Sequence, residues 1–397
     1  MYPARARIPG IIAVAVIAGA PLAAHAEPTL PAKLGEGFEL VAAPGNGVRA
    51  LDLRKGKQRT RFGSAAYVAS VQVDAAAHSV TLELENWCNR PYKETWTYAA
   101  LGARLENTSA YQLHRKANYK LAALGFARAV ALDPTWNIPA YNLASAQTLL
   151  GDQGAAIKAL APWLASAPIT TYVQVTMDRE LAPLLARPEL QAIHAKQPGT
   201  VTVTADGITG KVAVSADRTL LALVRAEHSW GSSSFTSQLE ILEAATGQLI
   251  ATTPLVTWND SNVDCYPSSS TAKDCSLTPA GRTAAGQRAA VIQTMLRELG
   301  FVQAVTEPSI TLENEGRGGK KRFSFPNHKL GLVVKDGAAS VLQNNTELGS
   351  GGAATFIDDA IFVEQPRLVV IWSTDPGSEG CDSTNPSHVS LIPVKTP

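Results

Sequence analysis

The stretch that decides the fold is residues 118–160, NYKLAALGFARAVALDPTWNIPAYNLASAQTLLGDQGAAIKAL. Ala122, Phe126 and Ala129 are spaced i, i+4 and i+7, which places a small, a large and a small residue on one face of a predicted helix. Residues 132–134, Leu-Asp-Pro, end that helix, because proline has no amide donor and disfavours helical backbone in the residue before it.

Two further helices are predicted in the same stretch. The second carries Tyr141, Leu143, Ala144, Gln147 and Leu150. Gly151-Asp152 ends it, and a third helix runs to Leu160. Alternating small and large residues let antiparallel helices approach closely while filling the space between them. This pattern resembles the tetratricopeptide repeat, and residues 177–190 resemble the cap that closes many bacterial arrays of such repeats.

The resemblance covers residues 99–197 and implies a fold class for the whole chain. We expect an α+β multidomain protein in which a short tetratricopeptide-like array of helical hairpins lies between two β regions. Only about two helix pairs are present, and a free-standing solenoid needs three or more. One of the β regions is therefore expected to support the array.

Strand and helix signals define the expected domains. A chain of 397 residues is too long for one typical core. Residues 27–98 alternate apolar and polar residues, most strictly at 80–85, and predict a small β unit. Residues 198–397 predict a β-rich α+β domain, whose first strand pairs weakly resemble a β-propeller blade. It contains one amphipathic helix, with Thr278 as N-cap and Gly300 after its end.

The N-terminus has the three parts of a secretory signal peptide. Arg5 and Arg7 provide the basic region, residues 11–23 the apolar run, and Ala24-His25-Ala26 a small-x-small cleavage site. An uncleaved membrane anchor is the alternative, but the run is shorter than the roughly 20 residues that a spanning helix needs. We therefore expect residues 1–26 to be removed and the mature protein to be periplasmic or secreted, without an integral membrane segment.

Composition narrows the classes of partner. Hydrophobic residues make up 45% and charged residues 17% of the chain, which is typical of globular proteins. The formal net charge is +1, and removal of Arg5 and Arg7 leaves 33 basic against 34 acidic residues. A near-neutral chain gives no electrostatic reason to expect nucleic acid or an anionic membrane as the partner.

The four cysteines of an exported chain predict two disulfides. Cys265 and Cys275 enclose a short polar loop and are the preferred pair, which leaves Cys88 and Cys381 for each other. Four cysteines allow three connectivities, so the pairing stays open. Closely spaced cysteine pairs with histidines are missing from the sequence, so neither a metal site nor a cofactor is expected.

The family resemblance also implies a binding groove. In tetratricopeptide arrays the first helix of each pair lines a concave groove that holds peptides, and here the matching helix is residues 138–149. It would present Tyr141, Asn142, Ser145 and Thr148, with the Asn142 carboxamide offering donor and acceptor to an extended peptide. The alternative is that Asn142 bonds a neighbouring helix.

Two other segments have the composition of candidate sites. The aromatic residues of 87–92 and 96–98 could form a ligand platform, but packing of the β unit onto the first helix is favoured. Asp260, Asn262 and Asp264 alternate like the start of a calcium loop. Cys265 and Thr271 stand where such a loop has glycine and glutamate, so calcium binding is not expected.

These observations favour a non-enzymatic, exported scaffold that binds a protein or peptide segment. The alternative is a periplasmic hydrolase or glycan-acting enzyme with its site in the C-terminal domain, around His228 and the 260–275 loop. The serine-rich run 231–237 lacks the flanking glycine of a nucleophile elbow. We therefore assign no catalytic residue. A third possibility is a mainly structural chain in which the helices join two β units.

Overall fold

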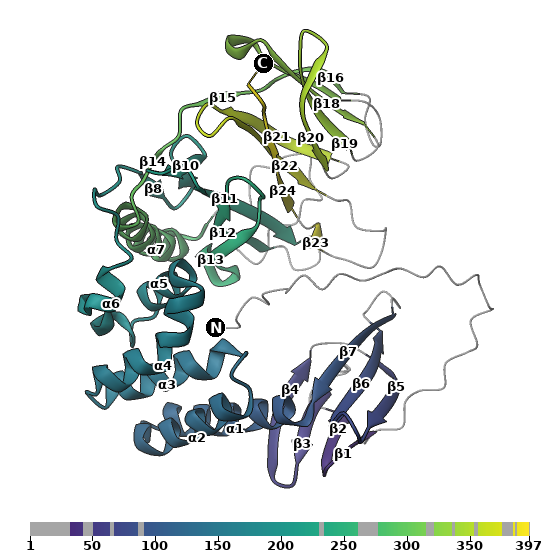
Figure 1. The fold of residues 1–397 in the computed structure, drawn as a ribbon, viewed down its shortest axis with the longest axis vertical. Coiled ribbons are helices and arrows are strands. Elements are labelled where there is room, and N and C mark those ends of the chain that lie inside the picture. Colours follow the sequence, from purple (N-terminus) through teal and green to yellow (C-terminus); the bar gives the residue numbers. More distant parts are fainter. Residues whose placement is uncertain are drawn as a thin grey trace, which may run out of the picture.

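The structure is a computed structural model that describes residues 32–42, 51–63, 67–85, 91–229, 234–260, 277–314, 321–335, 338–352, 356–374, 384–385 and 387–396. The expected signal peptide 1–26, all four cysteines and the loop 261–276 lie outside these ranges. The molecule is elongated, with the N-terminal sheets at one end, the first helices beside them and the C-terminal sheets at the other end (Figure 1).

Two small antiparallel sheets and one helix form the N-terminal part. The sheets have the strand orders β1-β2-β3-β4 and β5-β6-β7. Apolar side chains of both sheets, including Leu40, Leu53 and Leu82, share one core with Leu101 and Leu105 of helix α1 (Tyr98–Arg115). The strands are β1 Ala32–Gly35, β2 Phe38–Ala42, β3 Leu51–Lys55, β4 Gln58–Gly63, β5 Tyr67–Asp74, β6 Ser79–Glu85 and β7 Pro91–Thr97.

Tyr98 connects this helix to the first sheet. Its Oη donates to the Leu34 carbonyl oxygen at 2.8 Å, and its ring stacks on Phe38 with centroids 5.8 Å apart. Gly35 has a φ of 95°, and a Cβ there would lie 2.3 Å from Tyr98 Oη. Only glycine fits this close approach, because any side chain would displace the hydroxyl.

Helices α1 to α5 follow one another through short connections. Asp152 caps α4, since its Oδ1 accepts from Ala155 N at 2.9 Å. Gly125 lets α2 approach α1, because a Cβ there would lie 2.7 Å from Ala110 Cβ. The elements are α2 Tyr119–Leu132, α3 Asn137–Leu149, α4 Gln153–Ser166, α5 Pro168–Met177, the 3-10 helix η1 Ala182–Ala186 and α6 Pro188–Gln191.

The expected fold class, built around a tetratricopeptide-like array, is wrong. The described residues form seven α-helices and six small antiparallel sheets, and strands predominate. The helices of 99–197 join mixed cores: α1 packs with the N-terminal sheets, and α4 and α5 pack with the C-terminal part. A small-large pattern specifies close packing of a helix, but it does not require another repeat as the neighbour.

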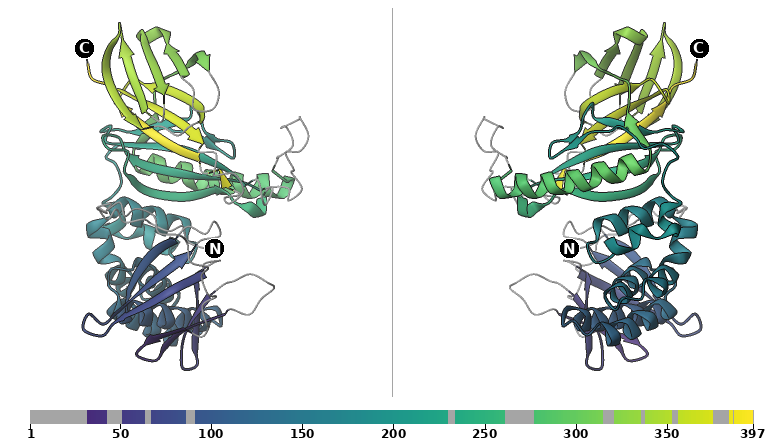
Figure 2. Two further views of the ribbon diagram at one scale, coloured as in Figure 1. Left: turned by 90° about the vertical axis from the view of Figure 1, so that its right-hand side faces the viewer. Right: turned by 90° about the vertical axis from the view of Figure 1, so that its left-hand side faces the viewer.

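Three antiparallel sheets are stacked in the C-terminal part (Figures 1 and 2). The inner sheet has the order β13-β12-β11-β10-β14, with β23 paired to β11. The middle sheet has the order β15-β21-β22-β24, and the outer sheet β16-β17-β18-β19-β20. A short ribbon of β8 (Val203–Thr204) and β9 (Gly207–Ile208) precedes them.

The three stacked sheets differ in the number and length of their strands. The inner sheet comprises β10 Val212–Ser215, β11 Leu220–Ser229, β12 Ser234–Glu243, β13 Leu249–Val256, β14 Phe301–Gln303 and β23 Thr384–Asn385. The middle sheet comprises β15 Thr306–Pro308, β21 Phe356–Val363, β22 Leu368–Thr374 and β24 Ser387–Pro393. The outer sheet comprises β16 Ile310–Asn314, β17 Lys321–Phe325, β18 Leu330–Lys335, β19 Ala338–Gln343 and β20 Thr346–Gly352.

The middle sheet is buried on both faces. Along β21, Ile361 and Val363 pack with the inner sheet, whereas Ala360 and Phe362 pack with the outer sheet. Successive side chains of a strand point to opposite faces, so one apolar run can fill two cores. The apolar run of residues 360–363 in this strand follows from its position between two layers.

Helix α7 (Pro279–Glu298) covers the other face of the inner sheet. It begins as predicted, with the Thr278 hydroxyl accepting from Gly281 N at 2.9 Å. Ile292, Met295 and Leu296 of α7 are fully buried in a core that also contains apolar residues of α4, α5 and the inner sheet. Figure 2 shows α7 lying lengthwise beneath the sheets. The C-terminal part is therefore layered as helices, inner sheet, middle sheet and outer sheet.

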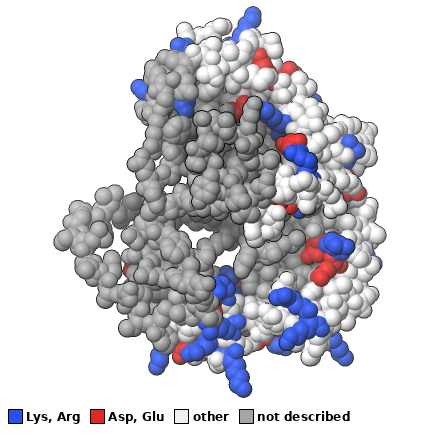
Figure 3. Space-filling view, turned by 180° about the vertical axis from the view of Figure 1, so that it is seen from behind, with Lys and Arg blue, Asp and Glu red and all other residues white. Residues whose placement is uncertain are grey.

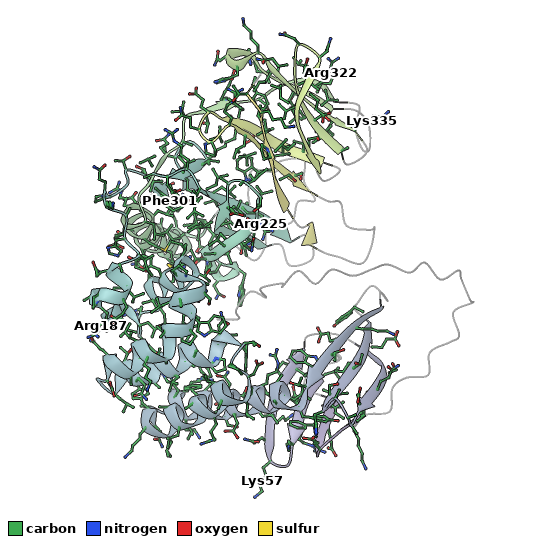
Figure 4. The ribbon with its side chains drawn as sticks, viewed as in Figure 1. Lys57, Arg187, Arg225, Phe301, Arg322 and Lys335 are labelled. Carbon is green, nitrogen blue, oxygen red and sulfur yellow. The ribbon has the colours of Figure 1, made fainter. Side chains whose placement is uncertain are left out.

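Labelled side chains mark the interior and the two ends of the molecule (Figure 4). Phe301 lies inside, where β14 follows α7, and is fully buried. Lys57 extends from the turn of the β3–β4 hairpin at one end of the molecule, whereas Arg322 and Lys335 lie at the other end, on the outer sheet.

Candidate functional site

The residues of the predicted groove form hydrogen bonds within the helical segment. Tyr141 Oη donates to Thr171 Oγ1 of α5 at 3.2 Å, and burial raises the pKa of the Tyr141 hydroxyl. Asn142 Nδ2 donates to Asn107 Oδ1 of α1 at 2.9 Å. The alternative interpretation of Asn142, a bond to a neighbouring helix, therefore matches the structure. Both side chains join α3 to the helices beside it.

Ser145 and Thr148, the other two predicted groove residues, are also engaged. Thr148 Oγ1 donates to the Ala144 carbonyl oxygen in its own helix at 2.8 Å. Ser145 Oγ donates to Glu180 Oε2 and lies 3.1 Å from His114 Nε2. These bonds orient the hydroxyls toward the protein itself.

The cluster of Ser145, His114 and Glu180 contains the residue types of a hydrolytic triad, but its geometry differs. His114 Nε2 lies 3.1 Å from Ser145 Oγ and 3.3 Å from Glu180 Oε2, so serine and carboxylate meet the same ring nitrogen. In a triad the carboxylate binds the opposite nitrogen and orients the ring. Ser145 is also only 4% exposed. This geometry supports a structural role and not nucleophilic catalysis.

A groove lies on the opposite side of α3. Leu143 is two residues from Tyr141, which is about 200° around the helix axis. The groove has a volume of about 540 Å³ and is formed by α2, α3 and α4. Its lining is Lys120, Ala123, Leu124, Ala127, Leu143, Gln147, Leu150, Ala155, Lys158 and Ala159. We call this set the α2–α4 groove.

The α2–α4 groove exposes apolar surface. Leu124 is 55% and Leu150 47% exposed, although each lies at a groove wall where a covering segment would bury it. Four alanines in the lining leave space between the helices for the side chains of another molecule. An apolar surface of this kind, with a polar rim, is typical of a protein interaction site.

Basic side chains border the α2–α4 groove. Lys120 and Lys158 are exposed on opposite walls, and neither forms an ion pair with another described residue. Lys and Arg side chains gather at the end of the molecule that carries the N-terminal sheets and the first helices (Figure 3). The acidic residues of α1–α4 and their connections already have partners: Glu106 binds Arg128, Asp133 binds Thr135, and Asp152 caps α4.

A buried tyrosine joins this helical segment to α7. Tyr172 Oη of α5 donates to Glu298 Oε2 and lies 2.8 Å from His194 Nε2. A hydroxyl has one proton, which the carboxylate accepts, so His194 is the donor to the tyrosine oxygen. Burial first, and then the bond to Glu298, raise the pKa of the Tyr172 hydroxyl.

Replacing Tyr172 with phenylalanine should lower the free energy of unfolding by about 1–3 kcal/mol, because Glu298 and His194 lose a shared partner. The raised pKa stabilises the folded state below the unfolded value of about 10, and this stabilisation is lost as pH rises beyond that value. Urea unfolding of both proteins from neutral to alkaline pH measures the effect. The Tyr172→Phe difference should shrink as pH rises, and a constant difference would contradict the role of this proton.

The remaining predicted sites have structural partners where they are described. Trp96 and Tyr92 pack on the N-terminal core, and the Arg104 guanidinium lies 4.2 Å from the Trp96 ring centroid. Asp260 is buried and bonded to Arg288 and Thr257. The described aromatic residues of the patch thus take part in the packing between sheet and helix, whereas Trp87 lies outside the described residues. The structure describes the backbone of His228 in β11 but not its side chain.

Within the described ranges, no group of three or more His, Cys, Asp or Glu side chains is placed to hold a metal ion. Among the described helices, none has the length and apolar character needed to cross a membrane. Comparison with known proteins finds no family model, no curated protein and no solved structure that matches this chain significantly.

The α2–α4 groove was not predicted from the sequence. The sequence signal that could have indicated it is Leu124, which lies outside the face formed by Ala122, Phe126 and Ala129 and lines the groove. A helix with a leucine opposite its buried face needs a second apolar contact or exposes that side chain.

Proposed function

We propose that this chain is a non-enzymatic binding protein whose α2–α4 groove takes a segment of a partner protein. The partner segment has an apolar face and carries acidic residues at its borders. The observation that carries the proposal is the combination of exposed leucines with two lysines, on opposite walls of one groove, that form no ion pair with another described residue. The expected export to the periplasm or outside of the cell belongs to the same proposal.

The apolar lining supports a helical segment as the ligand. Amphipathic helices place their apolar side chains into grooves through positions i, i+3, i+4 and i+7. The alanines of α2 and α4 leave the groove open above Leu143, so the ligand and not the protein supplies the large side chains. Burial of apolar surface contributes about 25 cal/mol per Å² and drives such an association.

The charge distribution around the groove favours a partner segment with negative charge. From Tyr98 to Ser166 the chain has six Lys and Arg residues against three Asp and Glu residues. This segment therefore has a formal net charge of +3, six minus three, so basic side chains predominate around the groove. Complementary charge raises the association rate and disfavours basic partners.

Two peptides of equal length and apolar content test the charge preference. Both are amphipathic helices of leucine and alanine, one with glutamate and one with lysine on the polar border. We expect the acidic peptide to bind in fluorescence anisotropy titrations and the basic peptide not to bind. Reversal of both groove charges, Lys120→Glu with Lys158→Glu, should reverse this preference.

Leu124→Ser should weaken binding of the acidic peptide at least tenfold. The reason is that Leu124 forms a groove wall, and loss of a buried leucine side chain removes about 1.5–3 kcal/mol of transfer free energy. Leu121→Ser is the matched control, since Leu121 lies on the same helix and is 49% exposed but does not line the groove. Anisotropy titrations of wild type and both variants measure the affinities.

Three outcomes would reject this function. Equal binding of acidic and basic peptides would remove the charge argument. Equal loss in Leu124→Ser and Leu121→Ser would show that the groove is not the contact. Self-association of the wild type that Leu124→Ser abolishes would show that a second copy of the chain covers the groove.

A further inference from the structure

A cavity lies where the three stacked sheets end together. It has a volume of about 390 Å³ and is lined by Arg218, His328 and residues 364–367. Arg218 belongs to the β10–β11 turn of the inner sheet, His328 ends the 3-10 helix η3 (Pro326–His328) of the outer sheet, and residues 364–367 join β21 to β22 of the middle sheet. Each sheet supplies one turn, so packing of the layers fixes the shape of the cavity.

His328 contacts one carboxylate that lines this cavity, Glu364, and one beside it, Glu307. Its Nδ1 lies 2.6 Å from Glu307 Oε2, and its Nε2 lies 3.3 Å from Glu364 Oε1. The ring lies against Phe362 with centroids 4.5 Å apart, and Asn327 N donates to Glu307 Oε1 at 2.7 Å. Both ring nitrogens face carboxylates, so these carboxylates are held by the histidine and not by the nearby arginines.

The two arginines of the cavity have no carboxylate partner among the described residues. Arg367 lies over the Phe362 ring, 5.5 Å from its centroid, and its Nε is buried without a hydrogen-bond partner. Asp217 is next to Arg218 in sequence, but its carboxylate accepts from the Ser215 hydroxyl at 2.6 Å, a bond that lowers the Asp217 pKa. A buried donor without a partner is costly, and the charge of two guanidinium groups that have no described carboxylate partner favours an anionic ligand in the cavity.

We propose that this cavity binds a small hydroxylated carboxylate of the hexuronate class. The carboxylate lies between the guanidinium groups of Arg218 and Arg367, whose planar forks match its geometry. Sugar hydroxyls donate to the Glu364 carboxylate and the Gln365 side-chain oxygen, and the sugar ring lies against Pro366. This site is separate from the α2–α4 groove and does not depend on the function proposed for it.

The charge balance favours a carboxylate over a phosphate. Glu364 contributes a negative charge at the cavity wall, which opposes a doubly charged ligand more strongly than a singly charged one. It also offers an acceptor that hydroxyl groups can use, whereas phosphate oxygens near pH 7 are mostly acceptors themselves. The volume lies within the range of small-molecule sites.

Isothermal titration calorimetry with glucuronate, glucose and inorganic phosphate tests this assignment on the full chain. We expect glucuronate to bind, and glucose and phosphate each to bind at least tenfold more weakly. Arg218→Ala should weaken glucuronate binding about tenfold or more, because it removes a charged hydrogen-bond donor. Arg218 is exposed, so its loss should leave thermal unfolding unchanged. Lys335→Ala is the matched control, since it removes an exposed cation of the outer sheet outside the cavity.

Each result that would contradict the hexuronate assignment rejects a different part of it. No heat of binding with glucuronate, or equal affinity in wild type and Arg218→Ala, would show that the cavity does not recognise carboxylates. Phosphate binding as tightly as glucuronate would show an oxyanion site without sugar recognition and would overturn the hexuronate assignment. Equal loss in Lys335→Ala would indicate a general effect of net charge.

Discussion

Replacing Asp260 with alanine should lower the free energy of unfolding by about 3–5 kcal/mol, the range for removing one partner of a buried ion pair. Asp260 Oδ2 pairs with Arg288 of α7 and accepts from Thr257 N at 2.6 Å and Thr257 Oγ1 at 2.8 Å. The side chains of Asp260 and Arg288 are only 6% and 24% exposed. Alanine would therefore leave a guanidinium without its counterion. Urea unfolding followed by far-UV circular dichroism measures the loss.

Two further variants separate the effect of the lost charge from the effect of the lost packing. Asp260→Asn keeps acceptor oxygen at this position and should lose less stability than Asp260→Ala. Arg288→Met in the Asp260→Ala background removes the unpaired charge and should recover part of the loss. A loss below about 1 kcal/mol in Asp260→Ala, as for exposed pairs, would contradict this role of the buried pair.

Local signals in the sequence predicted the ends of several elements. Thr278 caps α7 because its hydroxyl replaces a missing backbone acceptor, and Gly300 follows the helix with a φ of 77°. The alternation predicted for residues 80–85 is observed over 80–83 of β6, where Val80 and Leu82 are buried and their neighbours are partly exposed. Caps and alternation depend on residues a few positions apart, so one sequence contains the whole signal.

The arrangement of the elements was not predictable in the same way. Helix periodicity identified the Ala122, Phe126 and Ala129 face, which is buried, but not what the neighbouring helices would contact. The helices after α3 share a core with residues more than a hundred positions later in the chain, such as Met295 of α7 and Phe301 of the inner sheet. Such contacts leave no periodic signal near the helix. A family pattern was therefore extended to a fold that the chain does not adopt.

The candidate site illustrates the same limit. Tyr141 and Asn142 lie on the helix that was predicted to line a groove, but their hydrogen-bond partners are 30 and 35 residues away in the sequence. Sequence alone gives the residues on one helix face and not the direction in which that face points. The α2–α4 groove and the cavity at Arg218 both combine several elements, so they became visible only once those elements were placed.

Replacing Phe301 with alanine should also cost about 3–5 kcal/mol, because a fully buried aromatic side chain leaves a cavity. Phe301 fills the core between α7 and the helices that precede the inner sheet. Its carbonyl oxygen accepts from Thr200 N at 3.0 Å, and Gly199 approaches so closely that a Cβ would lie 1.8 Å from that oxygen. Phe301→Leu, which keeps most of the apolar volume, is the control and should cost less than about 1.5 kcal/mol.

The distribution of this loss tests whether the core acts as one unit. Helix α5 and strand β13 belong to the core of Phe301, whereas β6 belongs to the separate N-terminal core. Hydrogen exchange of the Phe301→Ala variant should therefore speed up equally in α5 and β13 and stay unchanged in β6. Faster exchange in β13 alone would show that the helices fold independently of the inner sheet. Faster exchange in β6 as well would show a single cooperative unit that includes the N-terminal sheets.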